Sequence, residues 1–98
     1  MDLNSATKAV AEGQFDLIIW DFWLGSSAIE KLITVARKKF PKATMIAAST
    51  GIGARMVQMR VGCDLEAGEF DKEMVLRGTL QKLFGTTKKL SKKKTMRA

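Results

Sequence analysis

The chain has 98 residues, of which 46% are hydrophobic and 28% charged, as expected for one small globular domain. Its apolar runs are too short to cross a membrane, and no secretory signal pattern opens it, so we expect a cytoplasmic protein without a membrane partner. It has no histidine and one cysteine, which leaves no metal-ligand cluster and no internal disulfide, and we do not expect an enzyme.

The net charge of +7 is concentrated at one end of the sequence. Residues 86–98 carry six of the seventeen basic side chains and none of the ten acidic ones, so residues 1–85 are nearly neutral. Short basic segments of low hydrophobicity are usually disordered and solvated. We therefore expect a domain over residues 1–85 and a disordered tail over 86–98. The tail could bind nucleic acid weakly and with strong salt dependence.

The first half of the chain predicts a helix, a strand and a second helix. A short helix is expected over 5–12, where apolar residues share one side and Gly13 follows. The apolar run over 15–20 suits a strand covered on both faces and ends at Asp21. Ser27 opens a capping box for a helix that is expected to run to about Lys39.

The second half predicts two more strands and two more helices. Residues 44–48 form a second short apolar run, and a helix is expected over about 54–61. Residues 63–67 make a poor strand because two of them are acidic, and a last helix is expected from Asp71 through Phe84. Short strands that alternate with amphipathic helices predict an α/β fold, with a parallel sheet and helices on both faces.

Several segments, in the same order, resemble the receiver domains of bacterial response regulators. Phe15-Asp-Leu-Ile-Ile-Trp-Asp21 is similar to the family's hydrophobic strand ending in aspartate, and Met45-Ile-Ala-Ala-Ser49 ends in a hydroxyl residue. Val61-Gly-Cys-Asp64 is similar to the family's Ala-Gly-Ala-Asp, and Phe70-Asp71 to its lead into the last helix. The resemblance implies a flavodoxin-like, doubly wound parallel sheet that lacks the family's first strand, first helix and second strand.

The resemblance also implies a phosphoryl site at the carboxyl ends of the strands, where open α/β sheets bind ligands. Asp21 takes the position of the phosphoacceptor, and Ser49 that of the hydroxyl that binds the phosphoryl group. The family binds Mg²⁺ with an acidic pair at the end of its first strand, which is absent from this chain. Asp21 and the backbone of Trp23 would therefore hold Mg²⁺ only if a partner supplied the pair, and otherwise we expect no cofactor.

Two other parts of the family's site are replaced. The lysine that ends the family's last strand falls at Gly68 or Glu69 in two alternative alignments, and the switch aromatic falls at Leu65 or Glu66. None of these side chains is cationic or aromatic. Because a phosphoryl donor is anionic, a carboxylate without a cation repels it. We therefore expect a degenerate receiver that does not take up phosphate productively alone.

The missing first strand also has a structural consequence. In the family this strand is central and lies beside the one that residues 15–20 resemble. Its loss would leave an open sheet edge with unpaired amides and carbonyls. We therefore expect a homo-oligomer, such as a homodimer, through edge pairing or exchange of an element, or pairing with a separate partner.

Three functions stay open. The first is a protein-interaction module in a two-component phosphorelay, which binds itself, a histidine kinase or phosphotransfer protein, or a full-length regulator. The second is a fragment of a larger, phospho-accepting response regulator whose missing strands are supplied elsewhere. The third is a small basic protein that binds nucleic acid through its tail.

Overall fold

The computed structural model describes residues 3–21, 27–68, 72–84 and 95–98, in which helices and strands alternate along the chain. The described elements, in chain order, are α1 (Leu3–Glu12), β1 (Leu17–Trp20), α2 (Ser27–Lys39), β2 (Thr44–Ala47), α3 (Ile52–Val61), β3 (Leu65–Glu66), α4 (Lys72–Phe84) and β4 (Thr95–Arg97). The predicted α/β class and the seven elements up to α4 are confirmed, with shifts of a few residues at their ends. None of the described helices has the length and apolar character needed to cross a membrane.

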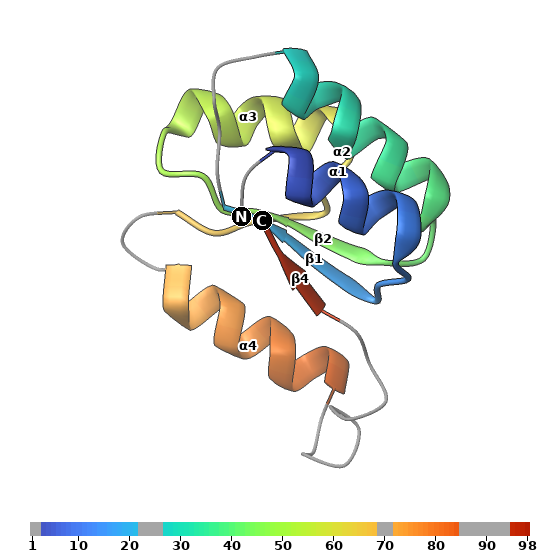
Figure 1. The fold of residues 1–98 in the computed structure, drawn as a ribbon. Coiled ribbons are helices and arrows are strands. Elements are labelled where there is room, and N and C mark those ends of the chain that lie inside the picture. The colour runs from blue at the N-terminus through green and yellow to red at the C-terminus, as the bar shows by residue number, and fades with distance from the viewer. Residues whose placement is uncertain (1–2, 22–26, 69–71, 85–94) are drawn as a thin grey trace.

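The sheet has four parallel strands in the order β3-β2-β1-β4 (Figure 1). Every residue of β1 is buried, as its unbroken apolar sequence requires of a strand with neighbours on both sides. β3 is only two residues long and both are exposed, which agrees with the weak pattern that its acidic residues predicted. It closes one end of the sheet, and β4 closes the other.

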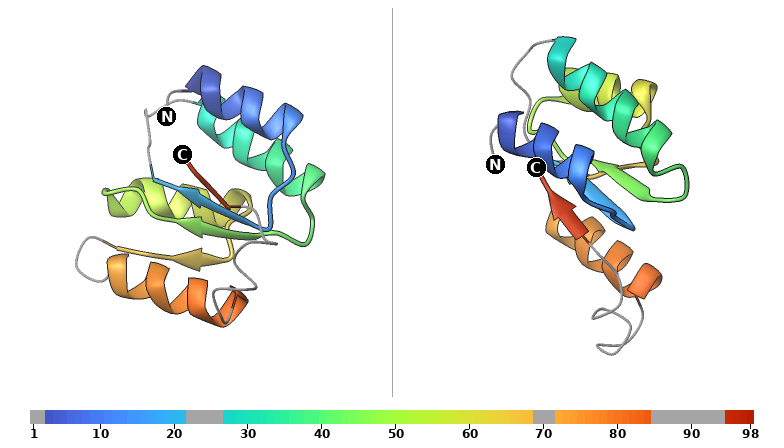
Figure 2. Two further views of the ribbon diagram at one scale, coloured as in Figure 1. Left: turned by 60° about the horizontal axis from the view of Figure 1, so that its bottom comes forward. Right: turned by 45° about the vertical axis from the view of Figure 1, so that its right-hand side comes forward.

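Helices cover both faces of the sheet, as expected (Figure 2). Side chains alternate along a strand, so Ile18 and Trp20 point to one face and Leu17 and Ile19 to the other. The first pair joins a core with α1, α2 and the end of α3, while the second pair joins a smaller core with Leu76 of α4. The molecule thus has three layers, with α1, α2 and α3 on one side and α4 on the other.

Arg37, in the last turn of α2, joins that helix to the turn before β3. Its Nε and Nη2 donate to the carbonyl oxygen of Gly62 at 3.0 and 2.8 Å, and Nη2 also donates to Asp64 Oδ2 at 2.7 Å. The same carboxylate oxygen accepts from the backbone N–H of Met45 at 2.9 Å. Arg37 and Asp64 therefore fix the relative positions of α2, β2 and the approach to β3.

The structure corrects two expectations about the C-terminal segment. The predicted disorder of residues 86–98 is wrong for residues 95–97, which form β4, while residues 86–94 lie outside the described part of the chain. The predicted open edge of the strand over 15–20 is also wrong, because β4 pairs with β1 in parallel, Leu17 facing Thr95 and Ile19 facing Arg97. The lysine-rich composition of the tail conceals a short segment whose apolar residues Met96 and Ala98 are buried in the core.

Candidate functional site

The carboxyl ends of the parallel strands lie along one edge of the sheet. Asp21 directly follows β1, Ser49 lies two residues after β2, and Arg97 is the last residue of β4. Because parallel strands all end on the same side, the fold brings the predicted Asp21 and Ser49 to this edge. It also brings Arg97, a residue that we had assigned to a disordered tail.

Asp21 is joined to β4 by side chain and backbone. Arg97 Nε donates to Asp21 Oδ2 at 2.7 Å, the Asp21 N–H donates to the Ala98 carbonyl, and the Ala98 N–H donates to the Ile19 carbonyl at 2.8 Å. Arg97 Nη2 also lies 3.9 Å from Glu73 Oε1 of α4. The two side chains of the Asp21–Arg97 pair are 28% and 45% exposed, so the pair is worth about 1 kcal/mol or less in stability. The pair matters more for the chemistry of Asp21 than for stability, because it holds a positively charged group against the carboxylate.

Ser49 is buried and its hydroxyl is held from α3. Gln58 Nε2 donates to Ser49 Oγ at 2.8 Å and lies 3.3 Å from the carbonyl oxygen of Trp20, the residue before Asp21. A carbonyl can only accept, so this contact fixes which end of the Gln58 amide faces the strands. Gln58, which is fully buried, therefore bridges the ends of β1 and β2.

Arg55 holds the backbone after Ser49. Its Nη1 donates to the carbonyl oxygens of Ser49 and Thr50 at 2.8 and 2.7 Å, and its Nε lies 3.4 Å from Glu66 Oε1 of β3. Only 8% of Arg55 is exposed, and its buried side chain links the backbone after β2 to β3. Together Arg55 and Gln58 hold both the backbone and the side chain of Ser49.

The positions that the resemblance to receivers assigns to a lysine and a switch aromatic carry neither group. Leu65 and Glu66 form β3 and are both exposed, and Gly68, two residues beyond it, is half-buried. Glu69 and Trp23, the other predicted site residues, lie outside the described residues.

The described residues do not fit a Mg²⁺ ion. Within them, no three His, Cys, Asp or Glu side chains come together as a possible metal site. Mg²⁺ requires several oxygen ligands, and its charge is best matched by more than one carboxylate. At Asp21 the Arg97 guanidinium lies 2.7 Å from Oδ2 and would repel a divalent cation from that oxygen. We therefore derive no chemistry through a metal here.

The sequence reasoning missed Arg97, Arg55 and Gln58. In α3 one signal was present, since the helix buries the polar Arg55 and Gln58 while it exposes the apolar Ile52 and Met56. Because buried polar groups need hydrogen-bond partners, such an inverted pattern indicates that the inward face of the helix binds polar groups, here at the ends of β1 and β2. Arg97 carried no comparable signal, because it follows a run of lysines.

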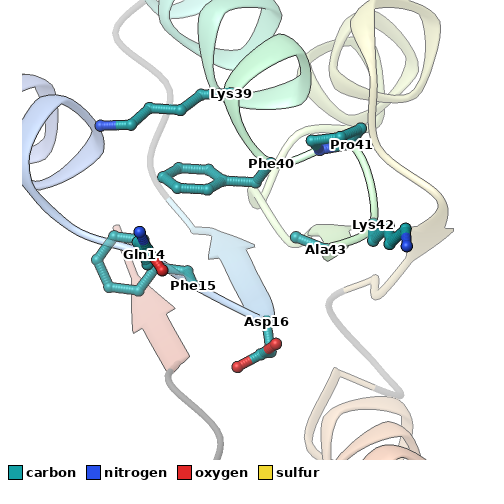
Figure 3. Close-up of a pocket in the computed structure, with 8 residues that line it drawn as sticks. All are labelled: Gln14, Phe15, Asp16, Lys39, Phe40, Pro41, Lys42 and Ala43. Carbon is teal, nitrogen blue, oxygen red and sulfur yellow. The ribbon is translucent and has the colours of Figure 1, made fainter.

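A cavity of about 500 Å³ lies at the opposite edge of the sheet, where β1 and β2 begin (Figure 3). The rings of Phe15 and Phe40 meet there edge to face, with centroids 5.7 Å apart. Lys39 also lines it, but its Nζ donates to the carbonyl oxygens of Val10, at 2.7 Å, and of Ala11, both in the last turn of α1. These residues join α1 to α2, and they do not belong to the edge that carries Asp21.

Comparisons with known proteins identify no relative: no protein-family model matches the chain, and no curated protein or solved structure is significantly similar to it.

Proposed function

We propose that this chain is a degenerate receiver: a flavodoxin-like, cytoplasmic module that binds protein partners of a two-component phosphorelay and does not take up phosphate productively alone. The observation that carries the proposal is the 2.7 Å contact between Arg97 Nε and Asp21 Oδ2 at the carboxyl edge of the sheet. It joins the acceptor-equivalent aspartate to a fixed cation, beside the end of the strand that leads to Ser49.

The arrangement of the strands supports the receiver part of this proposal. In that family the first strand lies beside the strand that ends in the acceptor aspartate. In this chain β4 occupies the corresponding place beside β1, with β2 and β3 following on the other side. The sheet therefore has the neighbours of a receiver around Asp21, although one strand comes from the other end of the sequence.

The charges at the edge support the second part, but for a different reason from the one given by the sequence: the expected lack of a cation beside Asp21 is wrong, because Arg97 binds it. The family's first strand ends in acids that collect Mg²⁺, whereas β4 ends in Arg97, so the sign of the charge beside Asp21 is reversed. The guanidinium binds Asp21 Oδ2 and draws negative charge from the carboxylate, which lowers the nucleophilicity of the group. Ser49 Oγ is meanwhile buried and bonded to Gln58, so the hydroxyl is not presented to a phosphoryl group.

Exposure to acetyl phosphate and Mg²⁺, followed by intact-mass spectrometry, tests the chemical half of the proposal. We expect no phosphoryl adduct on the wild-type chain, and Asp21→Asn serves as the matched control. A stable adduct on the wild-type chain that the Asp21→Asn variant lacks would show that Asp21 is a working acceptor.

Titration of the ¹⁵N-labelled chain with histidine-kinase dimerisation domains and histidine phosphotransfer domains tests the interaction half. We expect saturable shifts of backbone amides with at least one of these domains. If no member of such a panel shifts any amide at near-millimolar concentration, the proposed partner class is wrong. The two assays are independent, so either half can fail without the other.

A further inference from the structure

β4 is attached to the molecule in an unusual way for a strand next to the centre of a core. It is three residues long, it pairs with β1 along one side, and its other side faces no strand among the described residues. It nevertheless buries Met96 and Ala98 in the larger core and supplies the cation that binds Asp21. A small element thus completes both the sheet and the site.

Only a segment with a particular sequence can therefore take the place of β4 beside β1. It requires a short extended segment, parallel to β1, with an apolar side chain where Met96 faces Ile18 and, one residue later, a cationic side chain that reaches Asp21. The segment Thr95–Arg97 of a second copy meets these requirements by identity. Each contact that β4 makes with β1 is available equally within one chain and between two chains.

We propose that two copies of this chain exchange their last strands, so that Arg97 of each copy binds Asp21 of the other. The proposal does not depend on a role in a phosphorelay. Two routes to association were expected from the sequence: pairing through a bare β1 edge is excluded because β4 covers that edge, and exchange of an element is the route proposed here, with β4 as the element.

The connection between α4 and β4 is long enough for exchange. Ten residues separate Phe84 from Thr95 in the sequence. Fully extended, such a segment spans about 33 Å, which is comparable to the width of the molecule, 33 Å along its middle axis. A neighbouring copy is therefore within reach, and the concentration of the chain decides between the closed and exchanged forms.

Reversal of the charges in separate chains tests the exchange directly. In Asp21→Arg two positive side chains face each other, in Arg97→Asp two negative ones do, and neither variant relieves this repulsion within one chain or in a homodimer. An exchanged dimer of one copy of each variant restores an opposite-charge pair at both positions. We expect native mass spectrometry of a one-to-one mixture, with one variant ¹⁵N-labelled, to show at least about tenfold more heterodimer than either homodimer.

The double variant Asp21→Arg/Arg97→Asp is the matched control, because it restores the ion pair within each chain. Mixed with labelled wild-type chain, it should give no excess of heterodimer, since each mixed pair would bring like charges together. If the two single variants mix without a heterodimer excess, the proposal is overturned. Should either single variant fail to fold alone, the two are refolded together from urea, and absence of heterodimer then has the same meaning.

A shortened connection gives an independent readout. Deletion of residues 85–94 joins Phe84 directly to Thr95, so that no residue is left for the reversal of direction between α4 and β4 and β4 cannot return to its own β1. Such hinge shortening favours exchange. We expect light scattering to give a dimer at concentrations where the wild-type chain has a larger monomer fraction. A deletion variant that is as monomeric as the wild type, with β1 amides still protected from hydrogen exchange, would overturn the proposal.

Discussion

The contact between Gln58 and Ser49 should stabilise the fold only as long as both partners are present. Ser49→Ala removes the closer acceptor of Gln58 Nε2 and leaves this buried donor with the Trp20 carbonyl at 3.3 Å. A buried donor deprived of a partner costs about 1–2 kcal/mol. Gln58→Met nearly conserves volume and removes Oε1, which has no hydrogen-bond partner among the described atoms, so it should cost only about 1 kcal/mol.

The double variant Ser49→Ala/Gln58→Met should be no less stable than either single variant. It leaves no orphaned polar group at this position, because the Trp20 carbonyl still accepts from the Ala48 N–H at 2.9 Å. The costs are therefore expected to be non-additive, with a coupling energy of about 1–2 kcal/mol.

Urea unfolding followed by tryptophan fluorescence and circular dichroism measures the free energy of unfolding of each variant. Gln81→Met, at an exposed position of α4, is the matched control and should change it by no more than about 0.5 kcal/mol. If the costs of Ser49→Ala and Gln58→Met simply add, Gln58 does not couple the ends of β1 and β2 as we argue.

Four further predictions concern stability and are checked by the same unfolding assay. Arg37→Met should cost about 2–3 kcal/mol, because it removes the charge-assisted bonds to Gly62 and Asp64. Gly62→Ala should cost about 1–2 kcal/mol, since Gly62 has a φ of +156° and a Cβ there would lie 3.2 Å from Arg37 Cβ. Gly78→Ala should instead stabilise the fold by about 1 kcal/mol, because a Cβ on this residue of α4 would meet only open space. Burial, helped by the Asp64 charge, raises the pKa of the Cys63 thiol from 9.0 to about 12. The unfolded chain then loses a proton that the folded state keeps, so stability should fall as the pH rises from about 9 towards 12, and Cys63→Ala should abolish this part of the fall.

Most of the fold was predictable because the local and the long-range requirements agree. The unbroken apolar residues of β1 demanded neighbours on both sides, and the stripe on α2, from Ile29 to Ala36, demanded a sheet to pack on. The ends of the elements were less certain because they depend on loop backbone. For example, α3 begins at Ile52 and not at residue 54, since Gly51 has the extended backbone of an N-cap and the following glycine is accommodated in the helix.

Half of the candidate site could be predicted from the sequence. A residue could be placed where its neighbours in the sequence determine its position, and could not where a contact between distant residues does. Asp21 and Ser49 follow apolar strands, so the local sequence pattern predicts that both lie at the carboxyl edge of the sheet. Arg97 reaches the same edge only through the pairing of β4 with β1, a contact between residues nearly eighty positions apart. The bridging role of Gln58 depends likewise on its distances from Trp20 and Ser49, which only the structure gives.

The sequence reasoning joined two consequences, loss of the metal site and gain of an exposed edge, because one absent strand would cause both. The structure separates them. Backbone pairing beside β1 needs only an extended segment, whatever its side chains, and Thr95–Arg97 provides it. The chemistry at the carboxyl edge needs a particular side chain, and there the same segment provides the cationic Arg97, where the resemblance to receivers would call for acids. In the receiver that we propose, β4 fills the place of a strand while it reverses the charge at its end, and the pairing that completes the sheet also holds the cation on Asp21. Release of Asp21 from Arg97 by movement of the backbone therefore requires β4 to leave its place beside β1. Whether Asp21 is bound by a cation and whether β4 pairs within one chain or between two chains thus depend on the same short strand.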